Sequence, residues 1–208
     1  MTIDMDIRVA ELLCSRLCHE LVSPIGAINN GVELIEEMGE DMTDEAIALI
    51  AHSAGQAARR LRLLRLAYGA AGAGGTAGFA DAQQAASAYF TGGKISLDWP
   101  PGRLPDALAE RRGAAKMLLN LLVLGEEALA YGGTLRVDAD GGGPSVVAEG
   151  RAAGLRPETR AALEGSVAVD ALSPRTVHAF ATGSFAASYG FRLDVVPGTE
   201  RLELRLNP

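Results

Sequence analysis

Apolar positions in the first 38 residues recur at the spacing of one helical face. On a wheel of about 100° per residue they gather on one side, and His19 falls near the opposite side. The pattern predicts one long helix over residues 6–38 that presents His19 to a partner. The apolar side comprises Ala10, Leu13, Cys14, Leu17, Leu21, Pro24, Ile28 and Ile35, and the small or polar face around His19 comprises Ser15, Arg16, Ser23, Gly26, Ala27 and Asn30.

A second apolar repeat follows a polar turn. Gly39 ends the first helix, and Thr43 or Asp44 is available to cap the next one. Spacings of three and four then predict a helix to about Tyr68 with one apolar seam, made of Ile47, Ile50, Ala54, Ala57, Leu61, Leu64 and Tyr68. Two such helices make an antiparallel hairpin. Since a hairpin cannot cover both seams, we expect a homodimer in which two hairpins form a four-helix bundle.

Beyond residue 68 the pattern changes. The Gly/Ala tract of residues 69–78 predicts a flexible linker between a helical domain, 1–75, and a second domain, 79–208. The second domain is predicted to be an α/β sandwich with one layer of helices on a mixed or antiparallel sheet, so the whole chain is α+β. Its predicted helices are 81–90, 107–131, 157–163 and 174–189, with Pro174 in a first turn, and its strands are 94–99, 133–139, 144–148, 191–196 and 202–206.

The charge and the cysteine content of the chain limit the kinds of partner that it can bind. The formal net charge of −7 over 208 residues argues against nucleic acid or an anionic membrane as the main partner, and favours a protein or small ligand. Cys14 and Cys18 could form half of a metal site, but no second pair of ligands at a suitable spacing accompanies them, so we expect core packing. With no signal peptide or membrane span at the N-terminus, we expect a cytoplasmic protein.

His19 has informative neighbours. An exposed histidine alone is usually a solvated surface residue, but here Glu20 follows it and Pro24 lies five residues on, inside a helical pattern. An interior proline costs a helix about 3 kcal/mol and bends it, which indicates a shaped site. His52 and His178 have no such surroundings, and we expect structural or surface roles for both.

The segment from His19 to Pro24 resembles the H-box of two-component signalling proteins: a histidine, an acidic residue, and a proline at the fifth following position. The longer run CSRLCHELVSPIGAINNGVELIEE is similar to the ChpT-type histidine phosphotransferases of alphaproteobacteria. That resemblance implies phosphorylation of His19, a homodimer, and as partners the receiver domains of a hybrid histidine kinase and of response regulators. It implies no cofactor and no metal of the chain's own, because the receiver supplies magnesium.

The residues around His19 have candidate roles, for Glu20 both from this resemblance and from adjacency and for the others from their places on the helices. Glu20 either orients or deprotonates the imidazole, or is a solvated helix residue. Arg16 could meet the phosphoryl group. The candidate receiver-docking residues are Arg16, Ser15, Ser23, Gly26 and Asn30. A basic cluster on the second helix, which either complements the helix dipole or docks an acidic receiver, comprises Arg59, Arg60, Arg62 and Arg65.

Residues 79–208 are similar in element order to the ATP-binding domain of histidine kinases, the Bergerat fold. Asn120 matches the first asparagine of that family's helix, but Leu124 stands where a magnesium-binding asparagine is expected. Residues 149–155 depart from the family's D-x-G-x-G segment, and residues 169–175 contain no G-x-G. We therefore expect the architecture without the nucleotide site. Two rival functions stay open: an ATP-dependent histidine kinase, and an adaptor that docks receivers without carrying phosphate.

Overall fold

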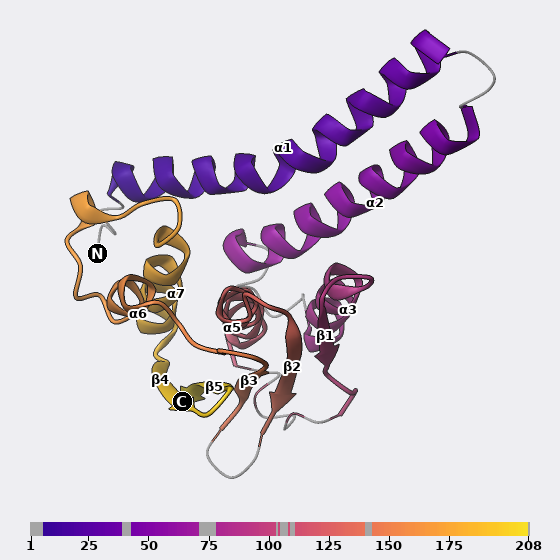
Figure 1. The fold of residues 1–208 in the computed structure, drawn as a ribbon. Coiled ribbons are helices and arrows are strands. Elements are labelled where there is room, and N and C mark those ends of the chain that lie inside the picture. The colour runs from indigo at the N-terminus through magenta and orange to yellow at the C-terminus, as the bar shows by residue number, and fades with distance from the viewer. Residues whose placement is uncertain are drawn as a thin grey trace.

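The computed structural model describes residues 6–38, 43–70, 78–102, 104, 108, 111–139 and 143–207. A long helical hairpin lies across a layer of helices, and a sheet lies beyond that layer (Figure 1). The predicted order of helices and strands is therefore confirmed, with a mixed five-stranded sheet in the second half. In the described parts of the chain, no helix is both long and apolar enough to cross a membrane.

The hairpin consists of α1, Ile7–Met38, and α2, Thr43–Tyr68. Both helices agree with their predicted spans. α1 stays one helix through Pro24, and Figure 1 shows that it changes direction along its length. The bend is expected because proline removes a backbone hydrogen bond and crowds the preceding turn. Of the predicted polar turn, 39–45, residues 39–42 lie outside the described residues and 43–45 begin α2; most of the predicted linker, 71–77, also lies outside them.

In the single chain, the predicted apolar seam of α2 consists of two stripes that differ in burial. A step of three residues turns the helix by about 60° one way and a step of four by about 40° the other. Only one stripe can then face α1, where a Cβ on Gly31 would lie 2.6 Å from the Ile50 side chain. Ile50, Ala57 and Leu64 are half or fully buried, whereas Ile47, Ala54 and Leu61 are exposed.

The expected core packing of Cys14 and Cys18 is wrong, since both side chains are exposed. By helical spacing they share a side of α1 with the exposed Val22 and Ile25, next to the side that packs on α2. Among the described residues, no three His, Cys, Asp or Glu side chains gather where they could hold a metal ion.

The second half carries its helices on one face of the sheet (Figure 1). The strand order is β1-β2-β3-β5-β4, with β1 parallel to β2 and the remaining neighbours antiparallel. The elements are α3 (Phe79–Phe90), β1 (Ile95–Asp98), α5 (Ala114–Ala128), β2 (Gly133–Asp138), β3 (Ser145–Glu149), α6 (Pro157–Leu163), η3 (Val169–Ala171), α7 (Val177–Tyr189), β4 (Arg192–Gly198) and β5 (Arg201–Asn207).

Two helices begin later than predicted. α5 begins at Ala114 rather than near residue 107, because Gly113 takes a left-handed conformation with φ of 82° directly before it. α7 begins at Val177, so Pro174 precedes the helix instead of lying in its first turn. The backbone carbonyl of Ser173 accepts hydrogen bonds from the N–H groups of Thr176 and Val177, which closes a separate turn before α7.

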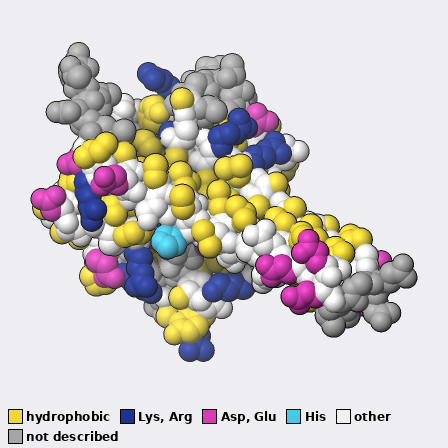
Figure 2. All heavy atoms as spheres, turned by 90° about the horizontal axis from the view of Figure 1, so that it is seen from above, with side chains coloured by type: hydrophobic (Ala, Val, Ile, Leu, Met, Phe, Trp, Pro, Cys, Tyr) yellow, Lys and Arg dark blue, Asp and Glu magenta, His cyan; other side chains and the backbone are white. Residues whose placement is uncertain are grey.

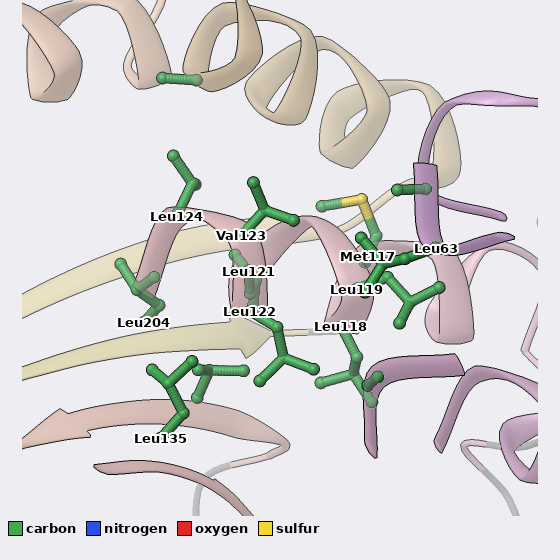
Figure 3. Close-up of a cluster of buried hydrophobic side chains, with 14 of the residues drawn as sticks. Leu63, Met117, Leu118, Leu119, Leu121, Leu122, Val123, Leu124, Leu135 and Leu204 are labelled. Carbon is green, nitrogen blue, oxygen red and sulfur yellow. The ribbon is translucent and has the colours of Figure 1, made fainter. Parts of the chain in front are cut away.

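The hydrophobic core extends across the predicted domain boundary. Leu63 of α2 is fully buried and lies beside the α5 cluster in Figure 3, where Leu135 and Leu204 come from the sheet. Along α5, six large apolar side chains have at most 1% of their surface exposed: Met117, Leu118, Leu119, Leu121, Leu122 and Leu124. The base of the hairpin is thus packed onto the second half, while the division at residues 75–79 stays a prediction.

Candidate functional site

His19 lies exposed on α1, at the edge of an open cleft. The cleft has a volume of about 680 Å³ and separates α1 from the turn that precedes α7. No described side chain hydrogen-bonds the imidazole, so both ring nitrogens are available to an incoming group. The cleft is lined by Arg16, His19, Glu20, Ser173, Pro174 and Arg175.

The helix face around His19 is open, as its small and polar residues predict. Ser23 and Asn30 are exposed, and Ser15 and Gly26 are half-buried. A Cβ placed on Gly26 would meet no atom within 4 Å. These four residues therefore lie half-buried or exposed along the helix that carries His19, with room for a partner to approach.

Glu20 is held by the second helix of the hairpin. Its carboxylate accepts a hydrogen bond from the Arg60 guanidinium at 2.5 Å, and its backbone carbonyl lies 3.5 Å from the same nitrogen. The two side chains are 30% and 36% exposed, so the ion pair lies at the surface. Glu20, which follows His19 in the sequence, therefore turns its carboxylate toward α2, where Arg60 holds it.

Arg16 is engaged with the second half of the chain. It donates to the Glu127 carboxylate at 2.6 Å, and only 13% of its side chain is exposed. It also reaches the backbone carbonyl of Pro174 at 3.5 Å. Burial raises the pKa of Glu127, and the Arg16 guanidinium offsets part of that rise. Arg16 thus joins α1 to α5 and to the turn before α7, instead of standing free beside His19.

Glu126 lies beneath the same region. It accepts a hydrogen bond from the Tyr89 hydroxyl at 2.8 Å, and burial raises its pKa. Burial likewise raises the pKa of Tyr89, so the phenol stays protonated and acts as the donor. Glu126 and Glu127 come from α5, about 110 residues from His19 in the chain. The hairpin near His19 therefore packs against partly buried carboxyl groups that come from α5, outside the hairpin sequence.

Sequence reasoning missed the residues that the second half brings to the cleft. Arg175 lines it, and Glu127 holds Arg16 from below. No motif marks either residue, because their role depends on how the two halves pack together. The only sequence signal was the Ser173-Pro174 pair, which indicates a turn.

His178 and His52 have the structural and surface positions expected of them. His178 is fully buried on α7, where its Nδ1 accepts from the Tyr68 hydroxyl at 2.8 Å and its Nε2 lies 3.2 Å from the Asn120 carbonyl. Because a carbonyl can only accept, Nε2 carries the proton. His52 is exposed on α2 beside Gln56.

Asn120, which the sequence analysis compares with an asparagine of histidine-kinase ATP-binding domains, faces the hairpin together with Lys116. The Asn120 amide donates to the backbone carbonyls of Ala67 and Lys116, both at 2.8 Å. Lys116 donates in turn to the carbonyls of Tyr68 and Gly69, at 3.0 and 3.1 Å. These two α5 side chains therefore bond the last carbonyls of α2 and its exit.

Comparison with known proteins agrees with this arrangement. Residues 79–201 match the family model described as the histidine phosphotransferase C-terminal domain, a span that begins after the hairpin. The chain is 36% identical to the protein phosphotransferase ChpT of Brucella abortus (strain 2308) over 191 residues, which cover 88% of each protein. A solved structure of a bacterial phosphotransferase superposes with a TM-score of 0.78 at 32% identity, covering 98% of this chain and 97% of that one. The chain belongs to the ChpT family of histidine phosphotransferases.

Proposed function

We propose that His19 carries a phosphoryl group between the aspartates of two receiver domains, one from a hybrid histidine kinase and one from a response regulator. The observation that supports this most is the exposed imidazole, without a hydrogen-bond partner among the described residues, at the edge of an open cleft. A neutral imidazole carries a nitrogen lone pair that can attack phosphorus.

The transfer needs no group beyond the two proteins. The unprotonated nitrogen of His19 forms a bond to phosphorus as the bond between phosphorus and the receiver aspartate breaks, and the aspartate leaves as a carboxylate. The second ring nitrogen keeps its proton. A second receiver reverses the exchange. Magnesium in the receiver stabilises the transferring charge, so the chain requires no metal or cofactor of its own.

The surface around His19 fits a docking role. Ser15, Ser23, Gly26 and Asn30 are small or polar side chains on α1 that leave the ring accessible. The Arg60–Glu20 ion pair holds the Glu20 carboxylate toward α2, so Glu20 leaves both nitrogens of the neighbouring imidazole open to the receiver. A receiver that lies across this face contacts α1 without displacing a large side chain.

A homodimer accounts for the apolar stripes that the hairpin leaves uncovered. Figure 2 shows hydrophobic side chains running along the protruding hairpin toward acidic side chains near its tip. The large apolar side chains that α1 and α2 leave exposed include Val22, Ile25, Val32, Ile47 and Leu61. Stripes of this kind on two adjacent helices are what a four-helix bundle buries when two hairpins pair.

The second domain has the form of a Bergerat-type domain without its nucleotide site. Asn120, which would serve a nucleotide in an ATPase, gives its amide to the Ala67 carbonyl. Leu124 is fully buried in the core and has no oxygen for a cation. These placements favour a phosphotransferase over an ATP-dependent kinase. Together with the protein partners, they are consistent with a place in the cytoplasm, where receiver domains operate.

The test is phosphate transfer between isolated receivers. A donor receiver is phosphorylated, and its label is followed onto this protein and then onto an acceptor receiver. His19→Ala should abolish both steps, whereas His52→Ala, the matched exposed histidine on α2, should leave them intact. Label that still crosses with His19→Ala would identify an adaptor. Label acquired from ATP by the purified protein alone would identify a kinase.

A further inference from the structure

The His19 cleft has two walls from distant parts of the chain. Arg16, His19 and Glu20 come from α1, and the turn of residues 173–175 comes from the second half. The charges on the α1 wall already have partners, since Arg16 pairs with Glu127 and Glu20 with Arg60. Arg175 is exposed and has no ion pair or hydrogen bond among the described residues. It is therefore the uncompensated cation of the cleft.

The turn that carries Arg175 is fixed. The Ser173 N–H donates to the Thr176 hydroxyl at 3.0 Å, and the Ser173 carbonyl accepts from the Thr176 and Val177 N–H groups. Arg16 of α1 reaches the Pro174 carbonyl at 3.5 Å and links the turn to the phosphoacceptor helix. The backbone of Arg175 is thus held on the cleft wall, while its long side chain is free to turn toward the ring.

A phosphoryl group on His19 brings about two negative charges into this cleft. Arg16 and Glu20 neither attract nor repel this group strongly, because Glu127 and Arg60 neutralise their charges. We propose that Arg175 binds the phosphoryl group at His19 through its guanidinium, which matches phosphate oxygens in charge and planar geometry. This inference rests on the proposed role of His19 and adds a direct part for the second domain in the transfer.

A small donor separates this role from receiver docking. Phosphoramidate phosphorylates imidazole without a protein surface: phosphorus forms its bond to the ring nitrogen as its bond to the amino nitrogen breaks, and ammonia leaves. Arg175→Glu should slow this labelling of His19 about tenfold, and Arg175→Lys should recover part of the rate, because a charged contact to an oxyanion is lost and then partly restored. Added salt should reduce the difference in labelling rate between Arg175→Glu and the wild type.

Arg156 provides the matched control. It is an exposed arginine of the same domain and lines the neighbouring cleft, with Arg16, Glu127 and Arg175, but not the cleft of His19. Arg156→Glu should label with phosphoramidate at the wild-type rate, although it makes the same change in net charge. Circular dichroism and thermal melts of the variants establish that each is folded.

Three results would overturn the inference. An unchanged phosphoramidate rate in Arg175→Glu would do so. An equal fall in Arg156→Glu would show a general charge effect instead of a contact. A loss confined to transfer from a receiver would make Arg175 a docking residue. Failure of the proposed function looks different, because His19→Ala would then pass phosphate between receivers as the wild type does.

Discussion

Acidification should destabilise this protein through His178, a buried histidine that the proposed transfer does not use. Burial lowers the pKa of His178 to about 3, and the nearby Arg16 guanidinium adds to that effect. The neutral ring is fully bonded: Nε2 donates to the Asn120 carbonyl, and Nδ1 accepts from the Tyr68 hydroxyl. Burial raises the pKa of Tyr68 to about 12, so the phenol remains a donor. Protonation of Nδ1 would place its N–H donor against the hydroxyl donor of Tyr68.

The sign and size of this pH effect on stability follow from the difference between the pKa of His178 in the folded and in the unfolded chain. In the unfolded chain the histidine takes up a proton near pH 6.5, whereas in the folded protein it does not do so until about pH 3. The contribution of neutral His178 to stability is therefore complete above pH 6.5 and is lost as the pH falls below it. Between pH 7 and pH 5 the loss amounts to about 2 kcal/mol.

The assay is urea unfolding at pH 7 and pH 5, at one fixed protein concentration, for the wild type and for His178→Gln. Glutamine can keep a donor and an acceptor near the same partners but does not titrate. The comparison is needed because the raised pKa values of Glu126 and Glu127 stabilise the folded state as the pH falls and act in the opposite direction. The wild type should lose about 2 kcal/mol relative to the variant. A difference that is the same at both pH values would refute the reasoning.

Three further outcomes are expected. Ile25→Asp places a charge on the exposed apolar stripe of α1 and should convert a dimer to a monomer in light scattering, with helix content retained; an unchanged dimer mass would contradict the proposed bundle. Gly183→Ala should lower the free energy of unfolding by about 1–3 kcal/mol, since its Cβ would lie 2.2 Å from the Leu163 carbonyl, whereas Gly154→Ala, with open space, should be near neutral. Arg60→Ala should change that free energy by less than about 1 kcal/mol in denaturant melts, because its ion pair is at the surface, and a larger loss would mean a structural role.

The helices of the hairpin were predictable because their signals are local. The 3.6-residue periodicity and the turn residues were enough to place both helices of the hairpin close to their observed bounds. The two late helix starts depended on single conformations instead: the left-handed Gly113 before α5, and the closed turn of Ser173 and Thr176 before α7. Neither changes the apolar pattern, so periodicity extended both helices too far.

The candidate site was predictable only on the α1 side. His19, with Glu20 and Pro24, stood out by spacing within one helix, and the open face around it followed from small residues. The partners that fix this face come from elsewhere: Arg60 from α2 and Glu127 from α5. Which side chains meet across the fold depends on packing between elements, and the residues themselves carry no periodic signal of it.

The junction between the two halves depends on two polar side chains of α5. Lys116 and Asn120 donate hydrogen bonds to the backbone carbonyls of residues 67–69. Both side chains are nearly or fully buried, so separating α5 from the end of α2 would leave their polar groups without acceptors. The bonds hold the second half against the base of the hairpin, and with it the turn that faces His19. A protein that receives its phosphoryl group from a partner has no need to move a nucleotide toward the histidine, and a fixed junction of this kind keeps the cleft assembled between transfers.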